Sequence, residues 1–82
     1  MTTTVELSMY PFRADFRDPI GDFVRALHGR DGLRVDTGPT STVIVGEHAL
    51  VMATLTDLFA WSQEAHGQSV FVAKVIPNYG EA

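Results

Sequence analysis

The chain has 82 residues and carries ten acidic residues against six lysines and arginines, a formal charge of −4. This acidic balance lacks the basic patch that holds nucleic-acid phosphates, so we expect no nucleic-acid partner. Cysteine is absent, which excludes disulfides, thiolate metal sites and thiol nucleophiles. The N-terminus shows no targeting pattern and no apolar run reaches transmembrane length, so we expect a cytoplasmic protein with no membrane partner.

A strand and a helix are expected in the first third of the chain. Apolar and polar residues alternate from Val5 to Tyr10, the period of a half-buried strand, which ends at Pro11 because proline donates no hydrogen bond to a sheet. Asp18 then offers an N-cap acceptor before a proline, and apolar residues follow at helical spacing. This pattern predicts a helix from about Pro19 to His28.

The rest of the chain predicts a hairpin, a long helix and a last strand. Gly38-Pro39 punctuates the link between the two hairpin strands, and Gly67 stands where a left-handed C-cap ends the long helix. The segment 77–80 is expected to be a frayed tail. By residue numbers, the strands are 33–37, 42–46 and 70–76, and the helix begins near 48.

This order of elements is the split βαβ, or ferredoxin-like, plan. It is an α+β two-layer sandwich in which two helices cover one face of a four-stranded antiparallel sheet. No repeat or linker interrupts the chain, so residues 1–82 are expected to form a single domain. From strand parity, the residues expected under the helices are Val5, Leu7, Met9, Leu33, Val35, Val43, Val45, Phe71, Ala73 and Val75.

The alternate strand positions are expected to cover the open face of the sheet. Because soluble monomers rarely expose a large apolar patch, a ligand or a second copy should cover this face, which predicts a homodimer or homotetramer. These positions are Glu6, Ser8, Tyr10, Arg34, Asp36, Thr42, Ile44, Val70, Val72, Lys74 and Ile76.

Two residues of this face are candidates for ligand binding. Glu6 and Tyr10 combine a carboxylate with an aromatic ring, and together such groups recognise an organic cation. The alternative is purely structural: Glu6 pairs with Lys74 on the adjacent strand, and Tyr10 packs at an interface.

A second candidate group lies at the start of the third strand. The hydroxyls of Thr40, Ser41 and Thr42 can read the polar edge of a small heterocycle, or they can satisfy the amides of the turn beside them. Glu47 lies at the start of the long helix, where the helix dipole favours a carboxylate with or without a ligand.

The histidines give no sign of a metal site or a catalytic centre. His28, His48 and His66 lack the spacing of a zinc motif and belong to no recognisable nucleophile arrangement. Trp61 is at helical spacing and is expected in a core or an interface. We expect no metal, no cofactor and no catalytic residue.

Three segments together resemble the thiamine-binding, YkoF-related family of small ferredoxin-like domains. They are Glu6-Leu7-Ser8-Met9-Tyr10-Pro11, Thr40-Ser41-Thr42 with Gly46-Glu47, and Val70-Phe71-Val72-Ala73-Lys74. The similarity spans nearly the whole chain, and it implies non-catalytic binding of thiamine or its hydroxymethylpyrimidine part by an oligomer.

The resemblance also implies roles for the candidate residues. Tyr10 would stack on or bound the ring, Ser8 and the hydroxyls of 40–42 would read its edge, and Glu6 or Glu47 would balance positive charge. Gly38 stands where the family pattern has an asparagine, which puts affinity and ligand choice in question.

Two other functions remain open. Small ferredoxin-like dimers also host cofactor-free oxygenases and isomerases, whose pockets lie between sheet and helices and need a buried histidine or acid. The helix-facing strand positions are expected to be wholly apolar, which disfavours this alternative. The third possibility is a structural or regulatory module, which would lack the cleft of several hundred Å³ that a ligand site should leave by the open face.

Overall fold

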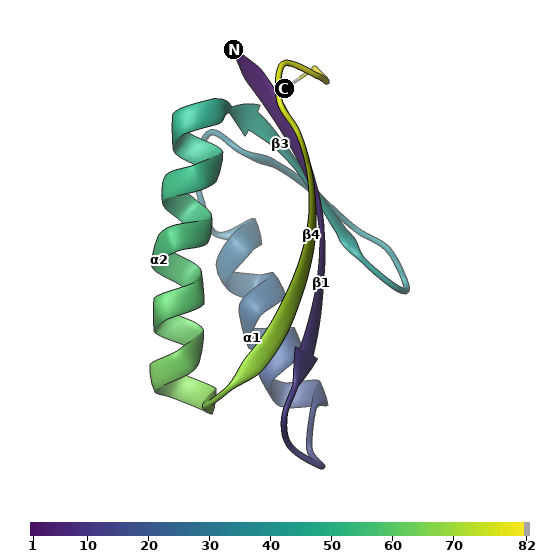
Figure 1. Cartoon of the computed structure of the whole chain (residues 1–82), viewed down its shortest axis with the longest axis vertical. Helices are drawn as coiled ribbons and strands as arrows, with labels where there is room; N and C mark the ends of the chain where they lie inside the picture. Colours follow the sequence, from purple (N-terminus) through teal and green to yellow (C-terminus); the bar gives the residue numbers. More distant parts are fainter. Residues whose placement is uncertain (82) are drawn as a thin grey trace.

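The computed structural model describes residues 1–81 and has the βαββαβ order predicted from the sequence (Figure 1). All four strands form one antiparallel sheet, in the order β2-β3-β1-β4. Both helices lie on the same side of the sheet, as Figure 1 shows, so the ferredoxin-like α+β fold is confirmed. The elements are β1 (Thr2–Pro11), α1 (Arg17–His28), β2 (Arg34–Thr37), β3 (Thr42–Glu47), α2 (His48–His66) and β4 (Ser69–Ile76).

The core lies between the sheet and the two helices. Its centre is an aromatic group in which the Phe23 ring of α1 lies 6.2 Å from Phe59 and 5.0 Å from Phe71, between ring centroids. Burial of large apolar side chains such as these stabilises the fold by about 1.5–3 kcal/mol each. The buried apolar residues around it are Val5, Leu7, Leu27, Ile44, Val51, Leu55 and Leu58.

The predicted facing of the third strand is wrong. Val5 pairs with Ile44 in the sheet, and both side chains are buried in the core. The side chains of Val43 and Val45 therefore lie on the open face, although we expected them under the helices. Residues 43–45 are all apolar, so alternation cannot fix their parity, and a shift of one residue exchanges the two faces of a strand.

The outer strand is also less buried than predicted. Ala73 and Val75 pair with Leu7 and Val5, which places them on the helix side of the sheet as expected. Both are nevertheless exposed, and Val75 keeps 41% of its surface accessible. The helices cover the centre of the sheet and leave this part of the edge strand open.

The chain after β4 is not the frayed tail that the sequence suggested. The backbone N–H of Tyr79 donates to the Thr2 carbonyl at 2.8 Å, and the Thr4 hydroxyl donates to the Tyr79 carbonyl at 2.7 Å. This segment covers one end of the open face. Gly80 lies so close to Thr4 and Val45 that an added Cβ would collide with them, which explains why Val45 is buried on that face.

The helix ends differ in detail from the prediction. Helix α1 begins at Arg17 after Phe16, whose side chain makes no capping bond. Asp18 thus lies inside the first turn and is not the N-cap. Gly67 ends α2 with a positive φ of 79° but an extended ψ, so it is not the left-handed cap expected there. Within residues 1–81, neither helix is long and apolar enough to cross a membrane.

Candidate functional site

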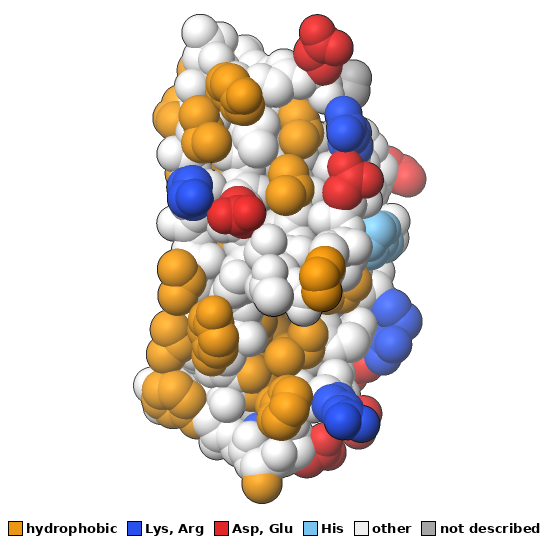
Figure 2. All heavy atoms as spheres, turned by 90° about the vertical axis from the view of Figure 1, so that its right-hand side faces the viewer, with side chains coloured by type: hydrophobic (Ala, Val, Ile, Leu, Met, Phe, Trp, Pro, Cys, Tyr) orange, Lys and Arg blue, Asp and Glu red, His pale blue; other side chains and the backbone are white. Residues whose placement is uncertain are grey.

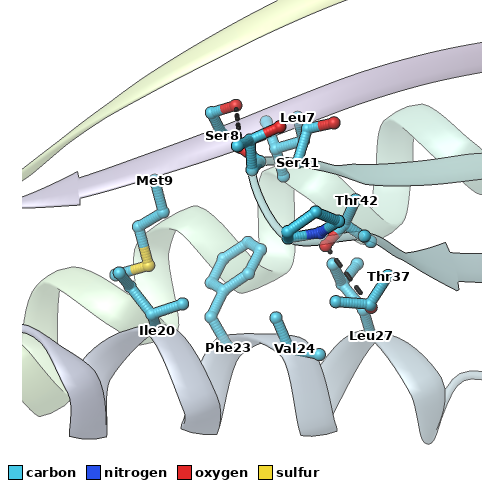
Figure 3. A pocket seen from close by; sticks show the side chains of 13 residues that line it. Leu7, Ser8, Met9, Ile20, Phe23, Val24, Leu27, Thr37, Ser41 and Thr42 are labelled. Atoms are coloured by element: carbon cyan, nitrogen blue, oxygen red, sulfur yellow. Dashed lines mark hydrogen bonds between the residues drawn. The ribbon is translucent and has the colours of Figure 1, made fainter.

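A cleft of about 140 Å³ opens between α1, β1 and the β2–β3 turn. In Figure 3 the side chains of α1 line one side of the cleft, and β1 and the turn lie on the opposite side. This is the helix side of the sheet, whereas the sequence suggested looking for a ligand cleft by the open face. The turn that forms its rim is held by the Gly38 N–H, which donates to the Ser41 carbonyl at 2.9 Å.

The walls of the cleft are mostly apolar and come from core residues. Helical spacing on α1 brings Ile20, Phe23 and Leu27 to one side, and β1 supplies Leu7 and Met9. An engineered apolar cavity of about 150 Å³ holds one benzene molecule. The cleft therefore has room for a single six-membered ring and not for a larger ring system.

One end of the cleft carries a short chain of polar groups. The Thr42 hydroxyl donates to the Thr37 hydroxyl at 3.4 Å, a contact drawn in Figure 3. His28 Nε2 lies 2.9 Å from the same Thr37 oxygen. Thr42 is buried, so its hydroxyl is a polar group inside an apolar surrounding and is available to orient a ligand.

A wider hollow of about 480 Å³ adjoins the cleft and shares several of its lining residues. Met9, Ile20 and Thr40 belong to both, so the hollow is the mouth of the cleft. Tyr10 and Phe16 line only the outer part, and more than half of each side chain's surface is exposed. Two aromatic faces at the opening suit a flat or cationic group.

The predicted site residues of β1 and the turn lie together, and Ser8, Thr40, Ser41 and Thr42 border the cleft, whereas Glu6 and Tyr10 do not. The Ser8 hydroxyl donates to the Thr40 carbonyl at 3.1 Å, and the Ser41 hydroxyl donates to Glu6 at 3.4 Å. In Figure 3 the side chains of Ser8 and Ser41 point away from α1, toward the open face. Glu6 also lies 3.5 Å from the Lys74 ammonium, the pairing that the structural alternative predicted.

Glu47 lies apart from the other predicted site residues. It pairs with Thr2 at one end of the β1–β3 ladder, whereas Thr42 pairs with Leu7 at the other end. Its carboxylate accepts a hydrogen bond from the Leu50 N–H at 3.2 Å and caps α2. Hydrogen bonds from the backbone N–H groups of Ala49 and Leu50 hold the pKa of this carboxyl below its usual value.

Sequence reasoning missed three residues that shape the site: His28, Thr37 and Phe16. Thr37 could have been found, because the predicted hairpin places it across from Thr42. His28 could not, because its contact with Thr37 depends on how the end of α1 packs against β2. Phe16 lies between β1 and α1, where no periodic pattern indicates which way a side chain points.

The lining of the cleft contains hydroxyl groups but no acid or imidazole. We predicted that the helix-facing strand positions are wholly apolar, and this is wrong. Thr42 faces the helices at the cleft, and Thr3 does so at the far end of the sheet. Within residues 1–81, no three histidine or acidic side chains are grouped closely enough to hold a metal ion. His48 contacts the Thr3 hydroxyl at 2.7 Å and His66 contacts Asp22 at 3.0 Å, both away from the cleft lining.

No protein-family model matches the chain, and no curated protein matches it by sequence. Solved structures do share its fold. A Thermotoga maritima protein, provisionally named as a thiamine biosynthesis/salvage protein, is 19% identical with a TM-score of 0.81, over 92% of this chain and 82% of that one. A Streptococcus pneumoniae protein is also 19% identical, with a TM-score of 0.84, over 99% and 89% of the two chains.

A further solved structure is a Bacillus cereus domain of unknown function of the class DUF77. It is 17% identical, with a TM-score of 0.73, over 100% of this chain and 83% of that one. At such low identities these similarities establish the fold and leave the function to be argued from the site itself.

Proposed function

We propose that the protein binds thiamine, or its hydroxymethylpyrimidine part, reversibly and without transforming it, in thiamine uptake, salvage or buffering. The observation that carries this proposal is the cleft on the helix side of the sheet, which is large enough for one six-membered ring. Its apolar walls suit the faces of a pyrimidine, and the hydroxyls of Thr37 and Thr42 suit its polar edge. The thiamine-related name of one structural neighbour supports the same ligand class.

The two chambers match the two parts of thiamine. With the neutral pyrimidine in the cleft, the cationic thiazolium would lie in the outer hollow between Tyr10 and Phe16. Aromatic faces attract such a cation by about 0.5–1 kcal/mol at exposed sites. The net charge of −4 is spread over the whole surface and adds little at one site.

The non-catalytic part of the proposal is supported by the composition of the cleft. The hydroxyls of Thr37 and Thr42 line the cleft, and its lining contains no acid or histidine. The imidazole of His28 contacts Thr37 from outside the lining, so no general base faces a ligand in the cleft. The second candidate is a cofactor-free enzyme, and the position of the cleft between sheet and helix favours it. Conversion of the ligand to a product of different mass would decide for that alternative.

We also propose that the protein assembles as a homo-oligomer through the open face of the sheet. Val70, Val72 and Ile76 are exposed there, and Figure 2 shows apolar side chains gathered on that face. In a two-fold symmetric dimer, the same face of a second copy would cover these side chains, because such an interface uses the same patch on both subunits.

Calorimetry with thiamine and with free hydroxymethylpyrimidine tests the binding proposal, with pyrithiamine and nicotinamide as comparison ligands. Val24 lines the cleft, so Val24→Phe should fill the space for the ring and abolish binding of both ligands. Trp61 lies on α2 outside the cleft lining, so Trp61→Phe should bind as the wild type does. Absence of heat and of a melting shift at millimolar thiamine, in folded wild-type protein, would refute the proposal.

A further inference from the structure

A histidine outside the cleft contacts a hydroxyl group that lines it. His28 is the last residue of α1, and its Nε2 atom lies 2.9 Å from the Thr37 hydroxyl oxygen. The Thr42 hydroxyl donates to that same oxygen at 3.4 Å. Thr37 and Thr42 line the cleft, whereas His28 does not.

The capacity of a hydroxyl group limits the roles that Thr37 can take in these two contacts. A threonine hydroxyl can donate one hydrogen bond and accept two. When His28 carries a proton on Nε2, both acceptor positions of Thr37 are occupied, one by the imidazole and one by Thr42. The Thr37 hydroxyl can then act only as a donor, and its proton is free for a ligand in the cleft.

Thr42 has the complementary role. Its proton is used toward Thr37, so the lone pairs of its oxygen are free to accept a hydrogen bond from a ligand. The end of the cleft thus presents a donor and an acceptor whose oxygens are 3.4 Å apart. This pair is complementary to a ring edge on which an acceptor atom stands beside an N–H donor.

We propose that His28 is a positioning residue that fixes Thr37 as a donor, so that the cleft selects heterocycles with a ring-nitrogen acceptor next to an exocyclic amino group. This inference rests on the proposed function, and it adds which edge of the ligand ring the cleft recognises. A pyrimidinone has the reversed edge, with an N–H in the ring and an adjacent carbonyl. Its N–H donor would meet the Thr37 donor, and its carbonyl acceptor would meet the Thr42 acceptor. Such mismatches weaken binding because the facing polar groups lose their water partners and gain no hydrogen bond in return.

The opposite imidazole tautomer would reverse the selection. With the proton on Nδ1, the Nε2 atom of His28 becomes an acceptor and takes the proton of Thr37. Thr37 could then only accept from the ligand. Protonation of both ring nitrogens does not reverse it, because Nε2 still donates.

The first test compares the affinities for 4-aminopyrimidine and pyrimidin-4-one forms of hydroxymethylpyrimidine by calorimetry. The wild type should bind the amino form about tenfold more tightly, the effect of one to two matched hydrogen bonds. Thr37→Val and His28→Leu should reduce this ratio roughly threefold or more, while Thr37→Ser and His28→Gln, which keep a hydroxyl and an N–H donor, should restore most of it. The control Thr56→Val removes an exposed α2 hydroxyl that bonds only the Met52 carbonyl, and it should leave the ratio unchanged.

The second test needs no ligand and separates this inference from the proposed function. Nitrogen NMR of the wild type in alkaline buffer, where histidine is neutral, should show the Nε2–H tautomer for His28. A predominant Nδ1–H tautomer would overturn the inference even if thiamine binds. Equal affinity for the amino and oxo ligands would overturn it as well, whereas failure of the wild type to bind either ring would refute the proposed function and the edge selection together.

Discussion

The carboxylate of Glu47 has a structural role that is complete without a ligand. It accepts the Leu50 N–H at the start of α2, and backbone hydrogen bonds lower its pKa. A carboxyl whose pKa is lower in the folded than in the unfolded chain stabilises the fold above its unfolded pKa. That contribution is lost as the pH falls through the folded pKa.

Glu47→Gln should therefore lower the thermal midpoint at neutral pH, because a neutral amide is a weaker partner for the helix N-terminus. The difference from the wild type should shrink as the pH falls and vanish once the native carboxyl is protonated. Thermal melts from pH 7 to strong acid measure this. Glu64→Gln, an exposed α2 acid far from that helix start, is the control, and an equal pH-dependent loss in it would contradict the assignment.

Tyr10 separates the two chambers of the proposed site. It lines the outer hollow but not the inner cleft, so it should contact the thiazolium part of thiamine and not the pyrimidine. Tyr10→Ala is expected to weaken thiamine binding by about 1 kcal/mol and to change the affinity for free hydroxymethylpyrimidine much less. Calorimetry with both ligands gives the two values, and an equal loss for both would place the pyrimidine at Tyr10 instead.

At the residue scale, the sequence located the segment that borders the cleft, but it did not show which of its hydroxyls face a ligand. The hydroxyl cluster at 40–42 forms the rim of the cleft. Its place could be predicted because the sequence indicates a hairpin around it. Which hydroxyls face the ligand depends on strand parity: Thr42 faces inward and Ser41 outward. His28 reaches Thr37 only because the end of α1 packs against β2, and no residue spacing in the sequence predicts this packing.

At the scale of elements, β3 combines a predictable position with an unpredictable facing. Its bounds match the expected strand to one residue, yet its parity was reversed because 43–45 is apolar throughout. Gly46 of this strand pairs with Thr3 on the helix side of the sheet. A Cβ at Gly46 would lie 2.6 Å from the Leu33 side chain and 3.4 Å from Val51.

Gly46→Ala is therefore expected to destabilise the protein by about 1–3 kcal/mol, the usual cost of overpacking a filled core. Chemical denaturation measures the change in the free energy of unfolding. The control is Gly29→Ala, since Gly29 follows α1 with helical angles and an added Cβ there meets only ordinary contacts at 3.5 Å or more. A neutral Gly46→Ala would show that β3 can move away from α2 at no cost.

At the scale of the whole molecule, the open face of the sheet is apolar and electrically balanced. Figure 2 shows its apolar side chains in an upper and a lower group. Two ion pairs neutralise its charges, with Lys74 3.5 Å from Glu6 and Arg34 3.1 Å from Asp36. The segment around Tyr79 covers one end of the face, so the area left for a second copy is the part beyond it.

Val72→Asp should dissociate the proposed assembly into monomers of 9.0 kDa. Val72 is 57% exposed on this face, and burying such a side chain between copies contributes about 1.5–3 kcal/mol, whereas burying an unpaired carboxylate there is strongly unfavourable. Sedimentation measures the mass, and Ala53→Asp on the exposed side of α2 should leave it unchanged. If wild-type protein sediments only as a monomer at micromolar concentration, the open face is not an interface, and its apolar residues would require another occupant.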